Sequence, residues 1–368
     1  MRKAVIVIPA YNEKGNIERV IAALFTNAKN IPNWEIHLLV VDSFSPDGTG
    51  KIVKQLQKKH NNLHIVEVEK SGLGNAYING FQYAFEKINP YLLFEMDADL
   101  SHDPDIISDF LIKIEQGADF VIGSRYIKGG EIPKNWGLHR KFLSFIGNMV
   151  VRLGFMKLKI TDWTSGYRAI KSWIVKDAYS HIKNYSGYVF QVALLDYAVT
   201  HKAHVDEVPL RFIDRTICES KINALQYSSN TLLYVFTHSA FIRFVIVGLI
   251  GFGVDFGVSY WLIEKLLWHS WQATLLSTEI AIVSNFLLNN FWTFSHKKLQ
   301  NSPLTYLWSF LKFNLISSGS VIIQTIGIAI TTSLFGQSLW YIYKIVIIAF
   351  IIIPYSYFFY NKFIWKER

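Results

Sequence analysis

The chain has 368 residues, a net charge of +9 and a mean hydropathy of +0.22. This length is too great for a typical single domain, and the one cysteine, Cys218, excludes an intrachain disulfide. The charge is unevenly spread: residues 1–239 carry 28 Lys and Arg against 24 Asp and Glu, whereas residues 240–368 carry 9 against 4. The composition therefore indicates an ordinary soluble domain followed by a much more apolar one.

Short apolar runs alternate with stretches of helical periodicity in the soluble part. The apolar runs predict strands at residues 5–8, 36–41, 63–68, 91–94 and 120–122. The periodic stretches predict helices near 14–28, 50–59, 74–87 and 104–116. The run at 5–8 is short and ends at Pro9, so it is typical of a first strand and not of a signal peptide. The alternation predicts an α/β domain with a Rossmann-like, mostly parallel sheet and helices on both faces.

Polar segments follow the first four predicted strands. They are residues 9–13, 42–49, 70–74 and 97–101. Parallel strands have their carboxyl ends at one edge of the sheet, and open α/β sheets bind their ligands at that edge. We therefore expect the four segments to converge on one ligand crevice.

The segment after the fourth strand carries two carboxylates, Asp97 and Asp99, two residues apart. Carboxylate oxygens, with Ser101 beside them, suit Mg²⁺ or Mn²⁺, and such an ion can hold a diphosphate. The same pattern also occurs in solvated turns, so its meaning depends on the rest of the crevice. Arg125, after the fifth strand, is a candidate cation for a phosphate group.

The other crevice segments offer groups for a nucleotide. Glu13 and Asp42 can accept hydrogen bonds from a base or a ribose, and Tyr11 can pack against a ring. The turn at residues 45–49 either contacts the ligand or only caps the helix that follows. Two glycines within residues 72–74 permit close approach of the backbone to a ligand.

These segments resemble the family 2 glycosyltransferases of GT-A fold. The motifs that carry the resemblance are Pro9-Ala10-Tyr11-Asn12-Glu13, residues 42–49 and Asp97-Ala98-Asp99-Leu100-Ser101-His102. Over residues 4–222 the chain is similar to the dolichyl-phosphate mannose synthases. The motifs for this are Gly123-Ser124-Arg125-Tyr126, Thr164-Ser165-Gly166-Tyr167-Arg168, Gly187-Tyr188-Val189-Phe190-Gln191, Val208-Pro209-Leu210-Arg211-Phe212-Ile213-Asp214-Arg215 and Glu219-Ser220-Lys221.

The resemblance implies an enzyme that makes a polyprenyl-phosphate sugar from a nucleotide sugar, with inversion and with Mg²⁺ or Mn²⁺ as cofactor. The implied partners are a nucleotide sugar, GDP-mannose foremost, a polyprenyl or dolichyl phosphate and the lipid bilayer, with no nucleic acid. By position, the nucleotide sugar would be bound by Pro9, Tyr11, Glu13, Asp42, Lys70, Asp97, Ala98, Asp99 and Arg125. The metal would be bound by Asp97, Asp99 and Ser101, and the acceptor phosphate by Arg125, Arg215 and Lys221. The implied catalytic residues are Asp99, Arg125, Arg215 and Lys221.

The chain departs from the family pattern at three positions. Ser43 replaces a second acidic residue, Ala193 replaces an acidic residue two positions after Gln191, and Cys218 replaces a glycine. Ser43 bears on the nucleotide preference and Ala193 on the acceptor side. The acceptor is a phosphate monoester, already anionic at pH 7, so the reaction requires positioning and charge stabilisation, not a strong general base.

Residues 138–160 form a basic, amphipathic stretch. Apolar residues recur at helical spacing from Phe142 to Leu153, and Arg and Lys flank them. Such a helix suits an anionic membrane surface, and it equally suits a helix packed on the core with a solvated face. A second stretch of this kind, residues 223–239, leads into the apolar domain as a juxtamembrane interfacial helix.

Four apolar segments, at about 241–263, 271–294, 307–333 and 339–361, are each long enough to cross a hydrocarbon core of about 30 Å. The alternative is a set of buried helices in a large soluble protein.

Lysines and arginines gather after the second segment and after the fourth: Lys297, Lys298, Lys362, Lys366 and Arg368. Residues 269–271 and 336–338, in the other two connections, contain neither. The positive-inside rule then predicts an integral, multi-pass membrane protein with the catalytic domain and both termini in the cytoplasm.

The apolar domain resembles the GtrA-like family. The matching features are Arg243-Phe244-Val245-Ile246-Val247-Gly248, Asp255 and Asn285-Phe286-Leu287-Leu288-Asn289-Asn290-Phe291-Trp292-Thr293-Phe294. Asp255, Glu279, Lys312 and Lys344 are charged residues inside predicted spans, which either handle a lipid head group or pair to hold the bundle together. The predicted domains are a GT-A domain at 1–222, the interfacial helix at 223–239 and an all-α, four-helix transmembrane domain at 240–368.

The sequence leaves three functions in competition. The first is mannose transfer from GDP-mannose to a polyprenyl phosphate at the cytoplasmic membrane face. The second is transfer of glucose or an N-acetylhexosamine from a UDP-sugar, because related enzymes share most of these motifs. The third is a non-catalytic transporter of lipid-linked sugars, against which the intact Asp97 and Asp99 pair argues.

Overall fold

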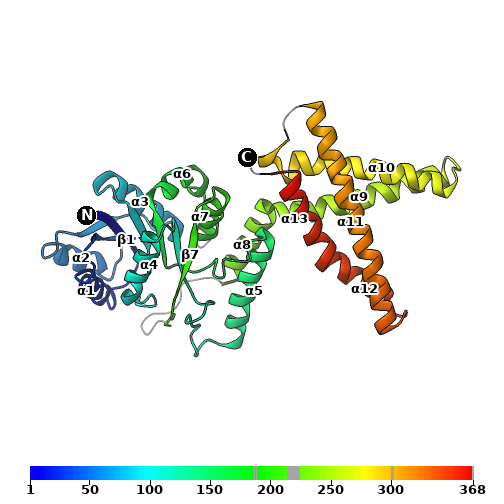
Figure 1. Ribbon diagram of the computed structural model, residues 1–368. Helices are drawn as coiled ribbons and strands as arrows, with labels where there is room; N and C mark the ends of the chain where they lie inside the picture. The colour runs from blue at the N-terminus through cyan, green and yellow to red at the C-terminus, as the bar shows by residue number, and fades with distance from the viewer. Residues whose placement is uncertain (186, 188, 214–223, 300–301, 367–368) are drawn as a thin grey trace. The chain divides into compact units, whose positions relative to one another are not determined.

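The computed structural model describes residues 1–185, 187, 189–213, 224–299 and 302–366. It divides into two compact units, Met1–Thr237 and His238–Arg368. The first unit contains the β-sheet, and the described part of the second is helical (Figure 1).

The first unit alternates strands and helices along most of its length. Its strands are β1 (Arg2–Ala10), β2 (Trp34–Asp42), β3 (Leu63–Glu67), β4 (Leu92–Glu95), β5 (Phe120–Ser124), β6 (Arg168–Lys171) and β7 (Val205–Pro209). Its helices are α1 (Ile17–Ala28), α2 (Thr49–Gln57), α3 (Leu73–Lys87), α4 (Ile107–Glu115), α5 (Leu138–Phe155), α6 (Ser172–Ile182), α7 (Val189–Thr200) and α8 (Ala224–His238). A 3₁₀ turn, Pro104–Ile106, precedes α4.

The strands form one sheet in the order β3-β2-β1-β4-β6-β5-β7. All neighbours are parallel except that β6 runs antiparallel to both β4 and β5. The expected mostly parallel α/β sheet is therefore confirmed, with all five predicted strands and all four predicted helices in place. Strands β6 and β7 and helices α6 and α7 were not predicted.

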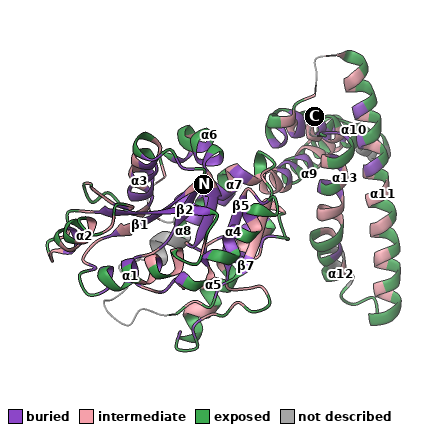
Figure 2. Ribbon diagram, turned by 60° about the vertical axis from the view of Figure 1, so that its left-hand side comes forward, coloured by how far each residue is buried: buried purple, intermediate pink, exposed green. Residues whose placement is uncertain are grey.

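Helices cover both faces of the sheet, as expected from the alternation of side chains along a strand. Ala4, Ile6 and Ile8 of β1 belong to a buried cluster with α1 and α4 on one face. Helix α3 packs on the other face, where a Cβ atom on Gly80 would lie only 2.5 Å from Val7 Cγ1. Figure 2 shows the strands buried between these layers. The sheet is thus a rigid base for the loops at its carboxyl edge.

The second unit consists of long helices and short connections. They are α9 (Ala240–Glu264), α10 (Ser270–Leu288), a π-helical turn (Asn289–Thr293), a 3₁₀ turn (Ser295–Lys297), α11 (Pro303–Phe335), α12 (Trp340–Ile347), a second π-helical turn (Ile348–Ile352) and α13 (Ile353–Phe363). Among the described residues, three helical segments are long and apolar enough to cross a membrane: Ala240–Glu264, Pro303–Phe335 and Ile345–Phe363. They coincide with the first, third and fourth predicted spans.

The second predicted span, residues 271–294, corresponds to α10 and the π-helical turn after it. Within the described residues it is not among the three apolar segments. Gln272, Glu279 and Asn285 lower its apolar character. The number of four spans therefore stays a prediction.

Much of the second unit is exposed (Figure 2), and many of its exposed residues are large and apolar. Phe252, Phe256, Leu315 and Phe350 are each more than half exposed. Exposed apolar area on this scale is rare on soluble proteins and marks a surface that contacts another apolar phase. This surface therefore suits the acyl chains of a membrane.

Candidate functional site

The loops after β1 and β2 are held together at the carboxyl edge of the sheet. The backbone N–H of Asn12 donates to Ser45 Oγ, and that of Glu13 donates to Thr49 Oγ1, each at 3.0 Å. Asn12 itself has a φ of 57°, a left-handed conformation that asparagine tolerates well. The structure thus brings the first and second polar segments side by side, as the strand order predicts.

Asp42 and Glu13 are buried in this edge. Asp42 Oδ1 accepts a hydrogen bond from Ser45 Oγ at 2.5 Å, and its Oδ2 accepts one from Ser45 N at 3.1 Å. Glu13 Oε2 accepts from Asn16 Nδ2 at 2.9 Å. A Cβ atom on Gly50 would lie 2.9 Å from Asp42 Oδ2, so a larger residue there would displace this carboxylate. Both carboxylates are therefore fixed in place, which suits a role in orienting a nucleotide.

The turn at residues 45–49 leads into α2, whose N-cap residue is Gly48. Asp47 Oδ1 accepts hydrogen bonds from Thr49 N at 2.9 Å and from Thr49 Oγ1 at 2.6 Å, and Asp47 Oδ2 accepts from Lys14 N at 3.0 Å. Burial raises the pKa of Asp47, but the bonds from Thr49 and Lys14 outweigh it and hold that pKa below its ordinary value. Asp47 thus ties this turn to the first residue of α2 and to the first polar segment, and contact of the turn with a ligand stays a prediction.

The third polar segment reaches the first through Lys70. Its Nζ lies 3.7 Å from the centroid of the Tyr11 ring, the geometry of a cation–π contact. Gly74, in contrast, is close to protein atoms: a Cβ atom there would lie 2.6 Å from Tyr185 O and 2.9 Å from Phe190 Cβ. Gly74 therefore serves the packing of α3, and the approach of a ligand to the backbone of residues 72–74 stays a prediction.

The loop after β4 presents the two predicted metal carboxylates. Asp99 is buried and its Oδ1 accepts a hydrogen bond from Ser101 N at 3.0 Å. Leu100 has a φ of 61°, which costs energy for a leucine and is typical of functional loops. The backbone N–H of Asp97 donates to His102 Nδ1 at 3.1 Å, and the His102 ring stacks on Tyr167 with a centroid distance of 4.9 Å.

The residues of this loop fit a divalent metal. Mg²⁺ is usually bound by one or two carboxylates together with substrate phosphates and water. Asp97 and Asp99 supply two carboxylates, and the Ser101 hydroxyl is buried with no hydrogen-bond partner among the described residues. The same part of the chain contains no cluster of three or more His, Cys, Asp or Glu that could hold a metal. A metal here would therefore depend on the diphosphate to complete its shell.

Arg125, the predicted phosphate cation, is bound by a buried carboxylate. Its Nε donates to Asp162 Oδ2 at 2.7 Å and its Nη2 donates to Asp162 Oδ1 at 2.8 Å, a bidentate pair. Arg125 Nη2 also donates to Thr164 Oγ1 at 2.9 Å. The guanidinium is thereby fixed at the carboxyl end of β5, next to the crevice.

Asp162 was not predicted from the sequence. Burial raises its pKa, but the charge and hydrogen bonds of Arg125 outweigh that and hold the pKa below its ordinary value. Glu207 supports the same loop, because its Oε1 accepts from Thr161 N at 3.0 Å and from Asp162 N at 3.1 Å. No pattern in the sequence indicates the pair of Arg125 and Asp162, since Asp162 follows no predicted strand and belongs to no spaced motif.

A buried arginine holds together loops at the carboxyl edge of the sheet. Arg168, fully buried, donates to the carbonyl oxygens of Trp163 at 2.8 Å, Ser165 at 2.7 Å and Gln191 at 2.6 Å. Its Nε lies 3.8 Å from Glu95 Oε2. Burial raises the pKa of Glu95 to about 7, although the charge of Arg168 opposes the rise. Arg168 thus ties the loop before β6 to the first turn of α7.

The other predicted site residues and the three departures from the family pattern lie in several parts of the chain. Arg215, Lys221 and Cys218 lie outside the described residues. Pro9 lies within β1 and pairs with Val41, and Ala98 is buried between the two aspartates. Of the departures, Ser43 donates its N–H to Ala10 O at 2.9 Å and Ala193 is fully buried in α7.

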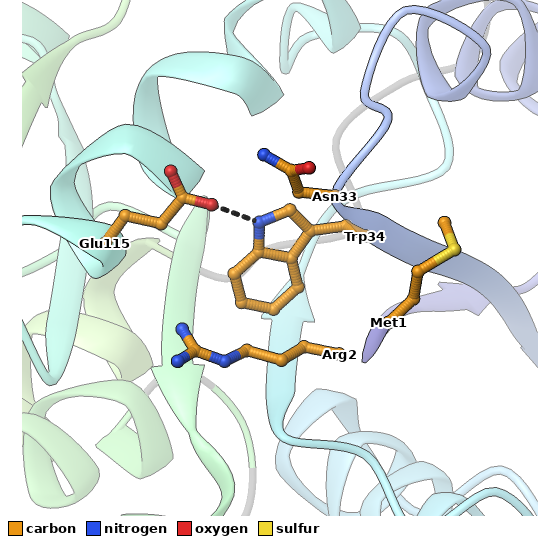
Figure 3. Close-up of a pocket in the computed structure, with 5 residues that line it drawn as sticks. All are labelled: Met1, Arg2, Asn33, Trp34 and Glu115. Carbon is orange, nitrogen blue, oxygen red and sulfur yellow. Dashed lines mark hydrogen bonds between the residues drawn. The ribbon is translucent and has the colours of Figure 1, made fainter.

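A separate cavity lies at the other edge of the sheet (Figure 3). It is lined by Met1, Arg2, Asn33, Trp34 and Glu115. The indole Nε1 of Trp34 donates to Glu115 Oε1 at 2.8 Å. Because β1 and β2 begin here, this cavity is at the amino edge, opposite the crevice that the carboxylates line.

Comparison with known proteins places each unit in a family. Residues 5–178 match the model of glycosyl transferase family 2, and residues 243–365 match that of the GtrA/DPMS transmembrane domain. Among solved structures, the first part of the chain is similar to glucosyl-3-phosphoglycerate synthase from Mycobacterium tuberculosis in complex with Mn²⁺, UDP and phosphoglyceric acid. The identity is 17%, the TM-score is 0.45, and 64% of this chain and 77% of that one are covered.

Two curated proteins are similar over most of their length. One is the polyprenol monophosphomannose synthase of Mycolicibacterium smegmatis, 34% identical over 60% of this chain and 82% of that protein. The other is the dolichol-phosphate mannosyltransferase of Pyrococcus furiosus, 32% identical over 87% of this chain and 88% of that protein, so that it spans both units. The chain is therefore a GT-A glycosyltransferase of family 2 with a GtrA/DPMS transmembrane domain, and it belongs to the family of polyprenyl-phosphate mannose synthases.

Proposed function

We propose that this protein transfers mannose from GDP-mannose to a polyprenyl phosphate, with inversion, to give polyprenyl-phosphate mannose. The observation that carries the proposal is the similarity to a dolichol-phosphate mannosyltransferase across both units. The relatives are named for mannose transfer to a polyprenol or its phosphate. The carboxylate-lined crevice at the edge of the sheet supplies the groups that a nucleotide sugar and its metal require.

The donor would lie across the carboxyl ends of β1, β2 and β4. Glu13 and Asp42 would accept hydrogen bonds from the nucleoside, and Tyr11 with Lys70 would flank it. Asp97, Asp99 and Ser101 would hold Mg²⁺ or Mn²⁺, which when bound neutralises charge on the diphosphate. Because the carboxylates of Glu13, Asp42 and Asp99 already accept hydrogen bonds within the chain, little reorganisation of these groups accompanies binding.

The chemical step needs no proton transfer. An oxygen of the acceptor phosphate attacks the anomeric carbon of the sugar as the bond to the diphosphate oxygen breaks, and the electron pair leaves with the nucleoside diphosphate. Attack from the face opposite the leaving group inverts the configuration. Arg125, Arg215 and Lys221 would bind the phosphate groups and stabilise the negative charge that moves between them.

Two helices of the first unit offer a surface for the lipid. Phe142 and Phe145 of α5 are 64% and 49% exposed, and Leu233 and Phe236 of α8 are 62% and 55% exposed. The two helices are packed together, since a Cβ atom on Gly154 of α5 would overlap Val235 of α8. These apolar faces, with Arg140 and Lys141 nearby in sequence, suit the surface of an anionic bilayer.

The membrane topology is part of the proposal. With four spans, the first unit and both termini lie in the cytoplasm. Lys297, Lys298 and the cations of the C-terminal tail favour this orientation, and Lys265 at the end of α9 is one cation on the other side.

One experiment tests the central claim. Purified full-length protein is assayed with a polyprenyl phosphate, Mg²⁺ or Mn²⁺, and either GDP-mannose or UDP-glucose. We expect lipid-linked mannose from GDP-mannose, no product with a chelator, and no product from Asp99→Ala. Asp109→Ala, an exposed aspartate on α4, is the control and should retain activity. A preference for UDP-glucose would replace GDP-mannose as the proposed donor. Unchanged transfer by Asp99→Ala would overturn the role of Asp99 in metal binding.

A further inference from the structure

The side chain of Gln191 has an unusual environment. It is 1% exposed, yet neither its Nε2 nor its Oε1 has a hydrogen-bond partner among the described residues. Leaving a buried amide unsatisfied costs free energy, so such a group in a native protein points to a ligand, a water or a catalytic role. The proposed function assigns no role to the Gln191 side chain, although Arg168 anchors the backbone of this residue.

Gln191 lies next to the metal-binding loop. A Cβ atom on Gly166 would be 3.0 Å from Gln191 Nε2 and 3.5 Å from His102 Cε1, so the amide and the imidazole flank the same glycine. His102 in turn accepts the backbone N–H of Asp97. One glycine and one histidine therefore separate the amide from the carboxylate that would meet the diphosphate of the donor.

The position of Gln191 is fixed by the backbone. Its carbonyl oxygen accepts from Arg168 Nη1 at 2.6 Å, and the same guanidinium binds the carbonyls of Trp163 and Ser165. The backbone of this residue is thus preorganised, while its side chain keeps three rotatable bonds with which to turn toward the crevice.

The chemistry of the amide selects among ligands. A phosphate at pH 7 can only accept hydrogen bonds and would satisfy Nε2 alone, and a metal ion would satisfy Oε1 alone. A hydroxyl group donates and accepts, so sugar hydroxyls satisfy both atoms. We propose that Gln191 hydrogen-bonds the hydroxyl groups of the transferred sugar and thereby contributes to sugar selectivity. This proposal rests on the proposed function, because it assumes that a nucleotide sugar occupies the crevice.

The test compares the affinities for a nucleotide sugar and for its nucleoside diphosphate. Dissociation constants for GDP-mannose and GDP are measured by calorimetry on full-length protein in detergent with Mn²⁺, for the wild type and for Gln191→Leu and Gln191→Glu. Leucine removes both hydrogen-bonding atoms at similar volume, and glutamate keeps only the acceptor. We expect Gln191→Leu to bind GDP-mannose about tenfold more weakly while its affinity for GDP stays within twofold. The affinity of Gln191→Glu for GDP-mannose should lie between those of the wild type and Gln191→Leu.

Val192→Ala, in the same buried turn of α7, is the matched control. It should lower the thermal stability without changing the ratio of the two affinities. Equal weakening of GDP and GDP-mannose, or no change in either, would overturn the role of Gln191. If the wild type binds UDP-glucose and not GDP-mannose, the proposed donor fails, and the same comparison with UDP-glucose and UDP still decides the role of Gln191.

Discussion

The guanidinium of Arg125 and the carboxylate of Asp162 form two parallel hydrogen bonds, Nε to Oδ2 at 2.7 Å and Nη2 to Oδ1 at 2.8 Å. Asp162 is fully buried, and the Arg125 side chain is only 9% exposed. Removing one member of such a pair leaves an uncompensated charge in a poorly solvated place.

Asp162→Asn should therefore both destabilise the protein and misplace Arg125. We expect a loss of about 3 kcal/mol in the free energy of unfolding and at least a tenfold fall in kcat/KM for transfer. Thermal unfolding and steady-state assays check the two effects. Asp206→Asn is the control: Asp206 pairs with Lys113 at the surface, where such a pair contributes about 1 kcal/mol or less. Full activity of Asp162→Asn would show that the pair is not needed to place Arg125.

Two glycines of α5 should respond in opposite ways to alanine. A Cβ atom on Gly154 would overlap Val235 of α8, whereas one on Gly147 would meet nothing within 4 Å. Gly147→Ala should raise the free energy of unfolding by about 0.5–1 kcal/mol through helix propensity. Gly154→Ala should lower it by about 1–3 kcal/mol, because α8 must shift away from α5. Thermal unfolding of the two variants side by side decides, and equal behaviour would contradict the close packing of these helices.

Asp196 should make stability depend on pH. Burial raises the pKa of Asp196 to about 6, although the hydrogen bond from Tyr234 and the charge of Lys157 oppose the rise. The folded state therefore holds this proton more tightly than the unfolded one, so stability falls as the pH rises from about 4 to 6.

Asp196→Asn removes the free-energy cost of burying the ionised carboxylate. At pH 7.5 it should unfold at a higher temperature than the wild type, by the equivalent of about 1–3 kcal/mol, and the difference should vanish near pH 4. Asp177→Asn, an exposed aspartate on α6, should change little at any pH. If Asp196→Asn is the less stable protein at pH 7.5, the carboxylate contributes more through its hydrogen bonds than its burial costs.

The apolar face of α5 should be needed for contact with the lipid bilayer and not for the sugar-transfer step. Phe142→Ser combined with Phe145→Ser should weaken the contact of α5 with an anionic bilayer. In reconstituted protein this is measured as a loss of protection of α5 against proteolysis. Transfer to a long-chain polyprenyl phosphate in the bilayer should fall several-fold, while transfer to a short, water-soluble polyprenyl phosphate stays the same. Ile112→Ser, which changes an exposed apolar residue on α4, is the control. Equal loss with both acceptors would place the effect in the catalytic crevice.

The strands that the sequence predicted are the ones with continuous apolar runs. β1, β2 and β4 are buried on both faces, so their composition alone identifies them. β6 was missed because it has only two apolar residues, between Arg168 and Lys171, and it is a strand only through its antiparallel pairing with β4 and β5. Long-range pairing of this kind leaves no local pattern in the sequence.

The candidate site was predicted in outline for the same reason. Polar residues at strand ends revealed where Glu13, Asp42 and Asp99 lie, because the topology of a parallel sheet brings strand ends together. Arg125, by contrast, is bound by Asp162, and Gln191 lies beside Gly166, so these contacts join segments that are far apart in the chain. Only the folded chain shows those contacts.

The antiparallel direction of β6 has a consequence for how the protein can diversify. β5 ends and β6 begins at the same edge of the sheet, so residues 125–167, with α5 among them, leave the crevice and return to it. A segment with adjacent ends can be lengthened or replaced at a small entropic cost, without disturbing the strands beside it. In the proposed function α5 contacts the lipid, so this helix can change to suit different acceptors while the carboxylates proposed to hold the nucleotide stay constant.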